Sequence, residues 1–215
     1  MKNDLPLEAV PSWTEIVLAY GKEPLRNALL DLLRFDQRLA RYVSNSKEPV
    51  LVQIRLEWWR AQFKEPPSIS ELNRGDPLLR SLALGWEDDL LALVALIDGW
   101  ESLLAEHPIA NGDMLEFVNG RAATFEALAK IAGCPEYGPE AAEHGRQWAY
   151  SDLARMGHVL PKTVHRRPPP LPKGLRPLAL IGGLAHRSIK RGGRAPMFGD
   201  RLSPIVALRL GIFGV

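Results

Sequence analysis

Acidic side chains at helical spacing are the residues of this sequence best suited to chemistry. Asp98 and Glu101 are three residues apart in LIDGWESLL, which places both carboxylates on one face of a helix. Asp152 belongs to a later segment, with Arg155 three residues further on. Such carboxylates could bind a divalent cation, or they could be solvated or paired with a neighbouring cation. Asp98, Glu101 and Asp152 are therefore the candidate catalytic residues, and both interpretations stay open.

A second group of polar residues is suited to binding a substrate. In KEPVLVQIRLEWWRAQFK, Arg55 and Gln62 fall in the gap between two apolar stripes, on the side that a packed helix buries. Gln147 and Arg155 lie together in a later helical segment. A buried guanidinium needs a partner, so Arg55 either meets a structural carboxylate or faces a polar pocket. We predict that Arg55 and Gln62 point into the interior, near the carboxylates.

The helix that carries Arg55 must be positioned by its apolar residues. One stripe at helical spacing consists of Val52, Leu56, Trp59 and Phe63. A second stripe consists of Leu51, Ile54, Trp58 and Ala61. The face predicted to meet water carries Gln53, Glu57, Arg60 and Lys64. Because a helix with two apolar stripes can pack against neighbours on two sides, we predict that the rest of the domain is organised around this helix.

The other segments also have helical period, and no strand candidate is found. Helices are predicted over 12–20, 24–43, 49–64, 77–84, 87–105, 113–131, 139–157 and 178–190, with a short turn at 68–73 and an apolar terminal helix from residue 202. The proline-rich basic segment 161–177 is predicted to be an extended connector, and 178–215 to form basic C-terminal helices. The sequence therefore predicts one all-α domain over residues 1–215.

Charge is distributed unevenly along the chain. Residues 1–159 hold 16 Lys or Arg and 24 Asp or Glu, a balance of −8, whereas residues 160–215 hold 11 Lys or Arg and one acid, a balance of +10. Such segregation suggests that the tail docks on the acidic body or meets an anionic partner, such as a membrane surface. Nucleic acid is not favoured as the partner, because no recognition motif accompanies the charge.

Several classes of chemistry have no support in the sequence. The single cysteine, Cys134, excludes an internal disulfide and fits a reducing compartment. The first 13 residues lack the apolar core of a secretory signal, and no apolar run reaches the roughly 20 residues that span a bilayer. We expect a cytoplasmic location, with peripheral attachment to the inner membrane face as the alternative. The five histidines are scattered, so no metal ligand is predicted.

Four blocks of the chain resemble the squalene/phytoene synthase family, in that family's order, between residues 24 and 161. They are ALLDLLRFDQRLARYV, EPVLVQIRLEWWR, LIDGWESLL and GRQWAYSDLARMGHVLP. The block IRLEWWR resembles a divergent branch that includes a complex I assembly factor with a phytoene-synthase-like fold. The resemblance implies an isoprenoid-synthase-like helical bundle around a central cavity, which holds prenyl diphosphates in active members.

The resemblance also implies a loss of activity. Active members carry two aspartate-rich motifs, because Mg²⁺ must bridge carboxylates and diphosphate. In place of the first motif, DDIVD, this chain has ARYVS at 40–44, without a carboxylate. In place of the second, NILRDxxED, it keeps Asp152 and Arg155 but lacks the downstream aspartates. The implied protein binds an isoprenoid or lipid, or acts as an assembly factor at a membrane, without a cofactor.

Two other interpretations remain. The first is an active, Mg²⁺-dependent head-to-head prenyltransferase of the phytoene/squalene synthase type, with a reduced metal site built from Asp98, Glu101 and Asp152. The second is a helical module that binds peptide or nucleic acid. Product analysis with prenyl diphosphates and Mg²⁺ separates the active enzyme from the inactive relative.

Overall fold

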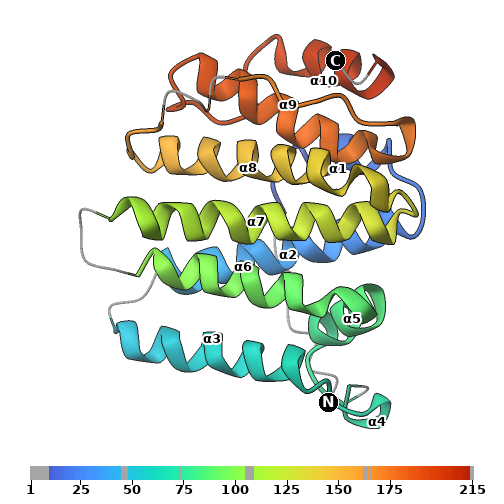
Figure 1. Cartoon of the computed structure of the whole chain (residues 1–215), viewed down its shortest axis with the longest axis vertical. Coiled ribbons are helices and arrows are strands. Elements are labelled where there is room, and N and C mark those ends of the chain that lie inside the picture. The colour runs from blue at the N-terminus through green and yellow to red at the C-terminus, as the bar shows by residue number, and fades with distance from the viewer. Residues whose placement is uncertain are drawn as a thin grey trace.

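A computed structural model shows a protein built from stacked helices (Figure 1). It describes residues 10–44, 48–72, 74–104, 109–161, 164 and 166–213. The other positions, among them 1–9, residues 73 and 105 and part of the predicted connector, lie outside the described residues. The described residues contain no strand, so the prediction of an all-α domain is confirmed. The α-helices are α1 (Thr14–Leu18), α2 (Leu25–Ser44), α3 (Pro49–Lys64), α4 (Ile69–Leu72), α5 (Pro77–Trp86), α6 (Leu90–Ser102), α7 (Asn111–Ile131), α8 (Gly138–Arg155), α9 (Arg176–Lys190) and α10 (Ser203–Phe213).

Six of these helices form a row in which each packs on the next. The order along the row is α3, α6, α7, α8, α9 and α10 (Figure 1). Helices α1 and α2 cover one side of the row: α2 contacts α3, α5, α6 and α7, and α1 contacts α2, α9 and α10. Consequently α3 and α10 are the two ends of the row, and each has a helical neighbour on only one side.

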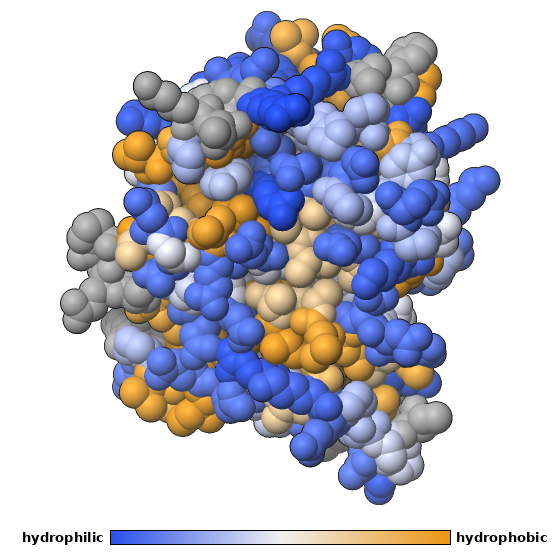
Figure 2. Space-filling model, viewed as in Figure 1, coloured by the Kyte–Doolittle hydropathy of each residue, from blue (hydrophilic) through white to orange (hydrophobic). Residues whose placement is uncertain are grey.

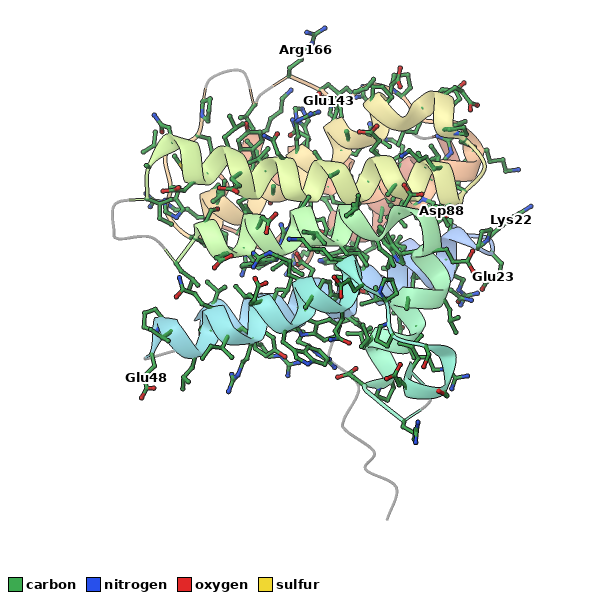
Figure 3. The ribbon with its side chains drawn as sticks, turned by 60° about the horizontal axis from the view of Figure 1, so that its bottom comes forward. Lys22, Glu23, Glu48, Asp88, Glu143 and Arg166 are labelled. Carbon is green, nitrogen blue, oxygen red and sulfur yellow. The ribbon has the colours of Figure 1, made fainter. Side chains whose placement is uncertain are left out.

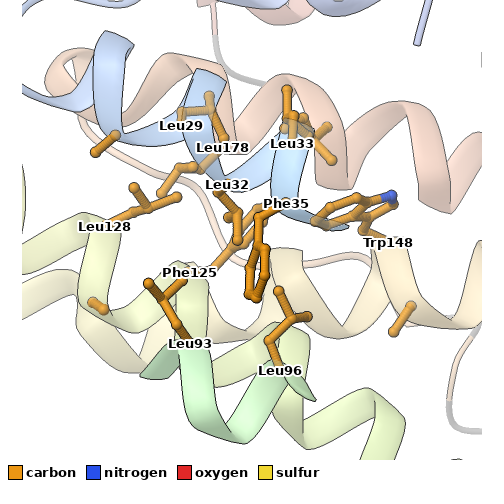
Figure 4. Packing of buried hydrophobic residues seen from close by; sticks show 14 of the residues in the cluster. Leu29, Leu32, Leu33, Phe35, Leu93, Leu96, Phe125, Leu128, Trp148 and Leu178 are labelled. Carbon is orange, nitrogen blue, oxygen red and sulfur yellow. The ribbon is translucent and has the colours of Figure 1, made fainter. Parts of the chain in front are cut away.

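The core lies between α2 and the row. Figure 4 shows side chains of α2 meeting those of α6, α7, α8 and α9, with Leu29, Leu32, Leu33, Phe35, Leu93, Leu96, Phe125, Leu128, Trp148 and Leu178 labelled. Helix α2 contributes so much because its leucines and Phe35 recur at helical spacing on one face. The apolar pattern of the sequence therefore places α2 across the middle of the molecule.

Helix α3 buries only one of its two apolar stripes. Val52, Leu56, Trp59 and Phe63 are buried. The second stripe, with Leu51, Ile54 and Trp58, lies on the surface at the end of the row, where Figure 2 shows hydrophobic atoms and Figure 3 places Glu48 at the start of the helix. Because α3 ends the row, none of the helices of the described residues covers its outer face.

The C-terminal segment packs on the body and completes the row. Residues 166–172 have no regular secondary structure, as predicted for the connector, and a 3₁₀ turn at Lys173–Leu175 leads into α9. Helix α9 is largely buried between α8 and α10. Within the described part of the chain, no helix is both long enough and apolar enough to cross a membrane.

Candidate functional site

A carboxylate lies at the centre of the molecule because of its position on α2. Asp36 is on the apolar face of this helix, next to Phe35 and one turn from Leu32 and Leu39, and it is fully buried. An isolated carboxylate in such surroundings would be strongly disfavoured, so it requires a charged partner or hydrogen-bond donors. Asp36 has both.

The partner of Asp36 is Arg121, a buried residue of α7. Its Nε and Nη2 donate to the two oxygens of Asp36, at 3.1 and 2.9 Å, and Trp100 Nε1 donates to Oδ1 at 2.9 Å. Its Nη1 donates to Asp152 Oδ2 at 2.6 Å. Such a two-pronged contact between guanidinium and carboxylate fixes geometry as well as charge. We call Asp36, Arg121 and Asp152 the central ion-pair network.

Three aromatic rings enclose the guanidinium of Arg121. Its Cζ lies 3.9 Å from the ring centroid of Trp148, 4.7 Å from that of Phe117 and 5.5 Å from that of Trp100. The faces of aromatic rings attract cations, so the rings contribute to holding the charge in the interior. Burial raises the pKa of Asp36, and the Arg121 guanidinium partly offsets that rise. The network therefore holds the charges of Asp36 and Arg121 in the interior, while Asp152 is partly exposed.

Close helix packing brings these residues together. A Cβ on Gly120 of α7 would lie 2.5 Å from the Ala95 oxygen of α6, and one on Gly145 of α8 would lie 2.6 Å from the Arg121 oxygen. Glycine at both positions lets the three backbones approach, which sets Arg121 beside α2 and α8.

A cavity of about 400 Å³ opens beside the network and includes two of the three predicted site residues of α8, Asp152 and Arg155. Its lining includes Asp36, Ala40, Ser44, Arg121, Asp152 and Arg155. Arg155 is exposed, and its Nη2 donates to Asp152 Oδ1 at 3.0 Å. The structure therefore brings Asp152 and Arg155 together, and it adds Asp36 and Arg121, which the sequence analysis did not single out. We call this space the central cavity.

Asp98 and Glu101 form a separate cluster with α3. They lie on one face of α6, as their spacing predicts, and both accept hydrogen bonds from Arg60: Nε to Asp98 Oδ1 at 2.9 Å and Nη2 to Glu101 Oε2 at 2.5 Å. Glu57 also contacts Arg60. Burial opposes the charge of Arg60, yet the hydrogen bonds to Glu101, Asp98 and Glu57 raise its pKa above the ordinary value. Neither Asp98 nor Glu101 lines the central cavity.

The prediction that Arg55 points inward is wrong. Arg55 is exposed, and its Cζ lies 5.5 Å from the ring centroid of Tyr42. Gln62 is half-buried on the same flank of α3. Arg60, predicted to meet water, is the arginine that reaches the carboxylates, because α6 packs against the other flank of the Trp59 stripe. The two flanks of the Trp59 stripe look alike in the sequence. The position of α6 determines which flank is buried.

Gln147 is buried but does not reach the central cavity. Its Nε2 donates to the backbone oxygens of Val164 at 3.1 Å and Arg166 at 3.3 Å, and its Oε1 lies 3.3 Å from His186 Nδ1. Arg166 directs its side chain outward, near Glu143 (Figure 3). Gln147 thus ties the connector to α8 and α9.

Asp36 and Arg121 did carry a signal in the sequence. Each is a charged residue one turn from apolar residues on both sides: Asp36 between Leu32 and Leu39, and Arg121 between Phe117 and Phe125. A charged residue on an apolar face is rarely buried alone, so two such residues of opposite sign are candidates for a buried pair.

The Mg²⁺ that the alternative, an active prenyltransferase, would need does not fit these residues. Arginine side chains already form ion pairs with the carboxylates of both clusters. Among the described residues, no group of three His, Cys, Asp or Glu could hold a metal ion. Comparison with protein-family models, curated proteins and solved structures finds no match for this chain. The resemblance to squalene/phytoene synthases therefore stays a hypothesis, and we derive no step through a metal.

Proposed function

We propose that this chain binds a lipid or isoprenoid at an anionic membrane surface and does not catalyse prenyl transfer. The observation that carries the proposal is the pairing of carboxylates with arginines: Arg121 holds Asp36 and Asp152, and Arg60 holds Asp98 and Glu101. A bound Mg²⁺ would have to displace a guanidinium at either cluster. At Arg121 that guanidinium is 1% exposed and lies against three aromatic rings, so displacing it would disturb the packing of the core.

The outer face of α10 supports attachment to a membrane. Leu202, Ile205, Leu208 and Ile212 are exposed there. The same end of the row carries the exposed cations Lys190, Arg191, Arg194, Arg201 and Arg209. Aliphatic side chains surrounded by basic residues are suited to the surface of an anionic bilayer, where each cation contributes on the order of 1 kcal/mol. The assembly-factor role rests on the resemblance alone, and the proposal does not include it.

Vesicle co-sedimentation tests the membrane part of the proposal. The full chain should bind vesicles that contain phosphatidylserine and should bind neutral phosphatidylcholine vesicles far more weakly. Binding should weaken as salt is added, because salt screens the attraction between charges near the surface. Equal binding to both vesicle types, or none to either, would contradict the proposal.

Product analysis tests the catalytic part. With farnesyl or geranylgeranyl diphosphate and Mg²⁺, we expect no release of diphosphate above a protein-free control. Turnover that is abolished by Asp98→Ala or Asp152→Ala would instead identify the active prenyltransferase.

A further inference from the structure

A second cavity, of about 650 Å³, lies at the C-terminal end of the row. It is lined by residues of α9 and α10, by Arg191 and Leu202 beside these helices, by residues 167–168 of the connector and by His144 of α8, and it is open to solvent on one side. It shares no lining residue with the central cavity, so it is a separate site. Its volume falls within the range of about 300–1,000 Å³ that is usual for ligand pockets. We call it the tail pocket.

Close contacts hold two walls of the tail pocket in place. A Cβ on Gly183 of α9 would lie 2.8 Å from both terminal carbons of Leu210, and one on Gly211 would lie 2.2 Å from the ring of Tyr20. Helix α10 therefore packs tightly against α9 and the end of α1. On the opposite side, His144 Nε2 is hydrogen-bonded to the Pro169 oxygen at 2.8 Å, which fixes the connector.

Cations of α9, α10, the connector and the residue after α9 line the pocket. They are Arg167, Arg187, Lys190, Arg191 and Arg209. Asp200 accepts from Arg187 Nη1 at 2.7 Å and from Nη2 at 3.0 Å, and it also contacts Arg191. Within the described part of the chain, no carboxylate lies at ion-pair distance from Arg167, Lys190 or Arg209. The pocket thus keeps an excess of positive charge after its one acidic neighbour is counted.

The wall formed by α10 and the residue before it is aliphatic. Leu202, Ile205, Val206 and Leu210 line it, and Ala179 and Gly183 of α9 add little polarity beside them. His144 adds no charge at neutral pH, because burial lowers its pKa to about 4. A ligand that fills this space must therefore be anionic at one end and apolar along its length.

We propose that the tail pocket binds a phosphate-headed amphiphile, with the phosphate at Arg167, Lys190 and Arg209 and the chain along the aliphatic wall of α10. Guanidinium and ammonium groups both bind phosphate oxygens through charge-assisted hydrogen bonds. This inference rests on the proposed function for the expectation that the ligand is a lipid. It goes further by naming the chemical groups of the ligand that the pocket would recognise.

Binding of a soluble probe tests the pocket without a membrane. The full chain is titrated calorimetrically with dioctanoyl phosphatidic acid below its micellar concentration, and separately with dioctanoyl phosphatidylcholine and inorganic phosphate. We expect phosphatidic acid to bind at least about tenfold more tightly than either comparator, since only it offers both a phosphate monoester and a chain. Equal affinity for phosphatidylcholine would overturn the charge assignment, and equal affinity for inorganic phosphate would overturn the role of the aliphatic wall.

Two double variants with the same loss of charge locate the site. Lys190→Gln with Arg209→Gln removes two pocket cations, and Arg194→Gln with Arg201→Gln removes two exposed cations that do not line the pocket. The first pair should weaken binding of phosphatidic acid by about tenfold or more, and the second by less than about twofold. Equal losses of affinity in both double variants would show that phosphatidic acid is attracted by the overall positive charge of this end, and would overturn the proposed binding site in the tail pocket.

The outcome is independent of the vesicle experiment. Specific binding of phosphatidic acid without vesicle binding would leave the tail pocket in place and contradict membrane attachment. Vesicle binding without specific binding of phosphatidic acid would overturn the pocket and leave membrane attachment in place.

Discussion

Two arginine–carboxylate clusters in this protein have the same chemistry at different depths. The side chains of Arg121 and Asp36 are 1% and 0% exposed, whereas those of Arg60 and Asp98 are 14% and 40% exposed. Removing one member of a buried pair leaves the other charge without compensation, while water compensates for the same loss near the surface. The depth of each cluster, rather than its number of hydrogen bonds, should decide its contribution to stability.

A matched pair of variants tests this difference. Asp36→Asn should lower the free energy of unfolding by about 3 kcal/mol, because Arg121 keeps its charge in the interior and, among the described residues, only Asp152 is left to pair with it. Asp98→Asn should lower it by less than about 1 kcal/mol, because solvent reaches that cluster. Urea denaturation followed by circular dichroism measures both. Equal losses would show that the central ion-pair network is not the more deeply buried of the two.

His144 should make stability depend on pH. Burial lowers its pKa from 6.5 to about 4, although its hydrogen bond with the Pro169 oxygen opposes the shift. The unfolded state therefore binds a proton that the folded state does not, and stability is lost as pH falls below 6.5 towards 4. Between pH 7 and pH 5 this residue should remove about 2 kcal/mol. The wild type should lose more stability over this interval than His144→Gln, and parallel pH curves would contradict the prediction.

Individual residues were the hardest features to predict from sequence. Asp152 with Arg155, and Asp98 with Glu101, share faces as their spacing predicts, because that relation is local to one helix. The partners of these carboxylates, Arg121 and Arg60, come from other helices. Spacing along one helix cannot show on which flank a neighbouring helix packs. The sequence alone therefore favours Arg55 over Arg60 as the arginine that reaches the carboxylates.

Where each helix begins and ends follows from the local sequence more closely than which of its faces is buried. Asp76 accepts hydrogen bonds from the backbone N–H groups of Leu78 and Leu79, and Pro77 occupies the first turn, so the predicted start of α5 is confirmed. The position of α3 at the end of the row, by contrast, depends on how all the helices pack. Its second apolar stripe is exposed because no helix in the described part of the chain packs on that side.

The contact between α8 and α9 depends on a single glycine. A Cβ on Gly182 would lie 2.2 Å from His144 Nδ1 and 2.6 Å from His144 Cβ, and the hydrogen bond to Pro169 holds that ring in place. Gly182→Ala should therefore destabilise the protein by about 1–3 kcal/mol through overpacking. Gly85→Ala is the control, because nothing lies within 4 Å of its Cβ position, and it should be neutral or stabilising by up to about 1 kcal/mol. Thermal unfolding compares them; similar melting temperatures in the two variants would contradict the close contact.

At the scale of the whole molecule, the row of helices has two apolar ends that differ in charge. Helix α3 exposes Val50, Leu51, Ile54 and Trp58, and α10 exposes Leu202, Ile205, Leu208 and Ile212. The segregation of charge along the sequence places the +10 tail at the α10 end. Among the described residues, the α10 end combines exposed aliphatic side chains with the cations of residues 187–209, which is why we propose it as the end that meets an anionic bilayer.

Substitutions of equal exposure at the two ends test this polarity. Ile205 and Leu208 are 64% and 54% exposed, and Val50 and Ile54 are 64% and 60% exposed, so aspartate should be tolerated at all four positions. Ile205→Asp with Leu208→Asp removes apolar surface and adds repulsion at the α10 end, and binding to phosphatidylserine vesicles should fall about tenfold or more. Val50→Asp with Ile54→Asp adds the same charge at the far end of the row, beyond the Debye length of about 8 Å at physiological salt, and binding should change less than about twofold. A larger loss in the α3 variant would assign membrane contact to the opposite end of the molecule.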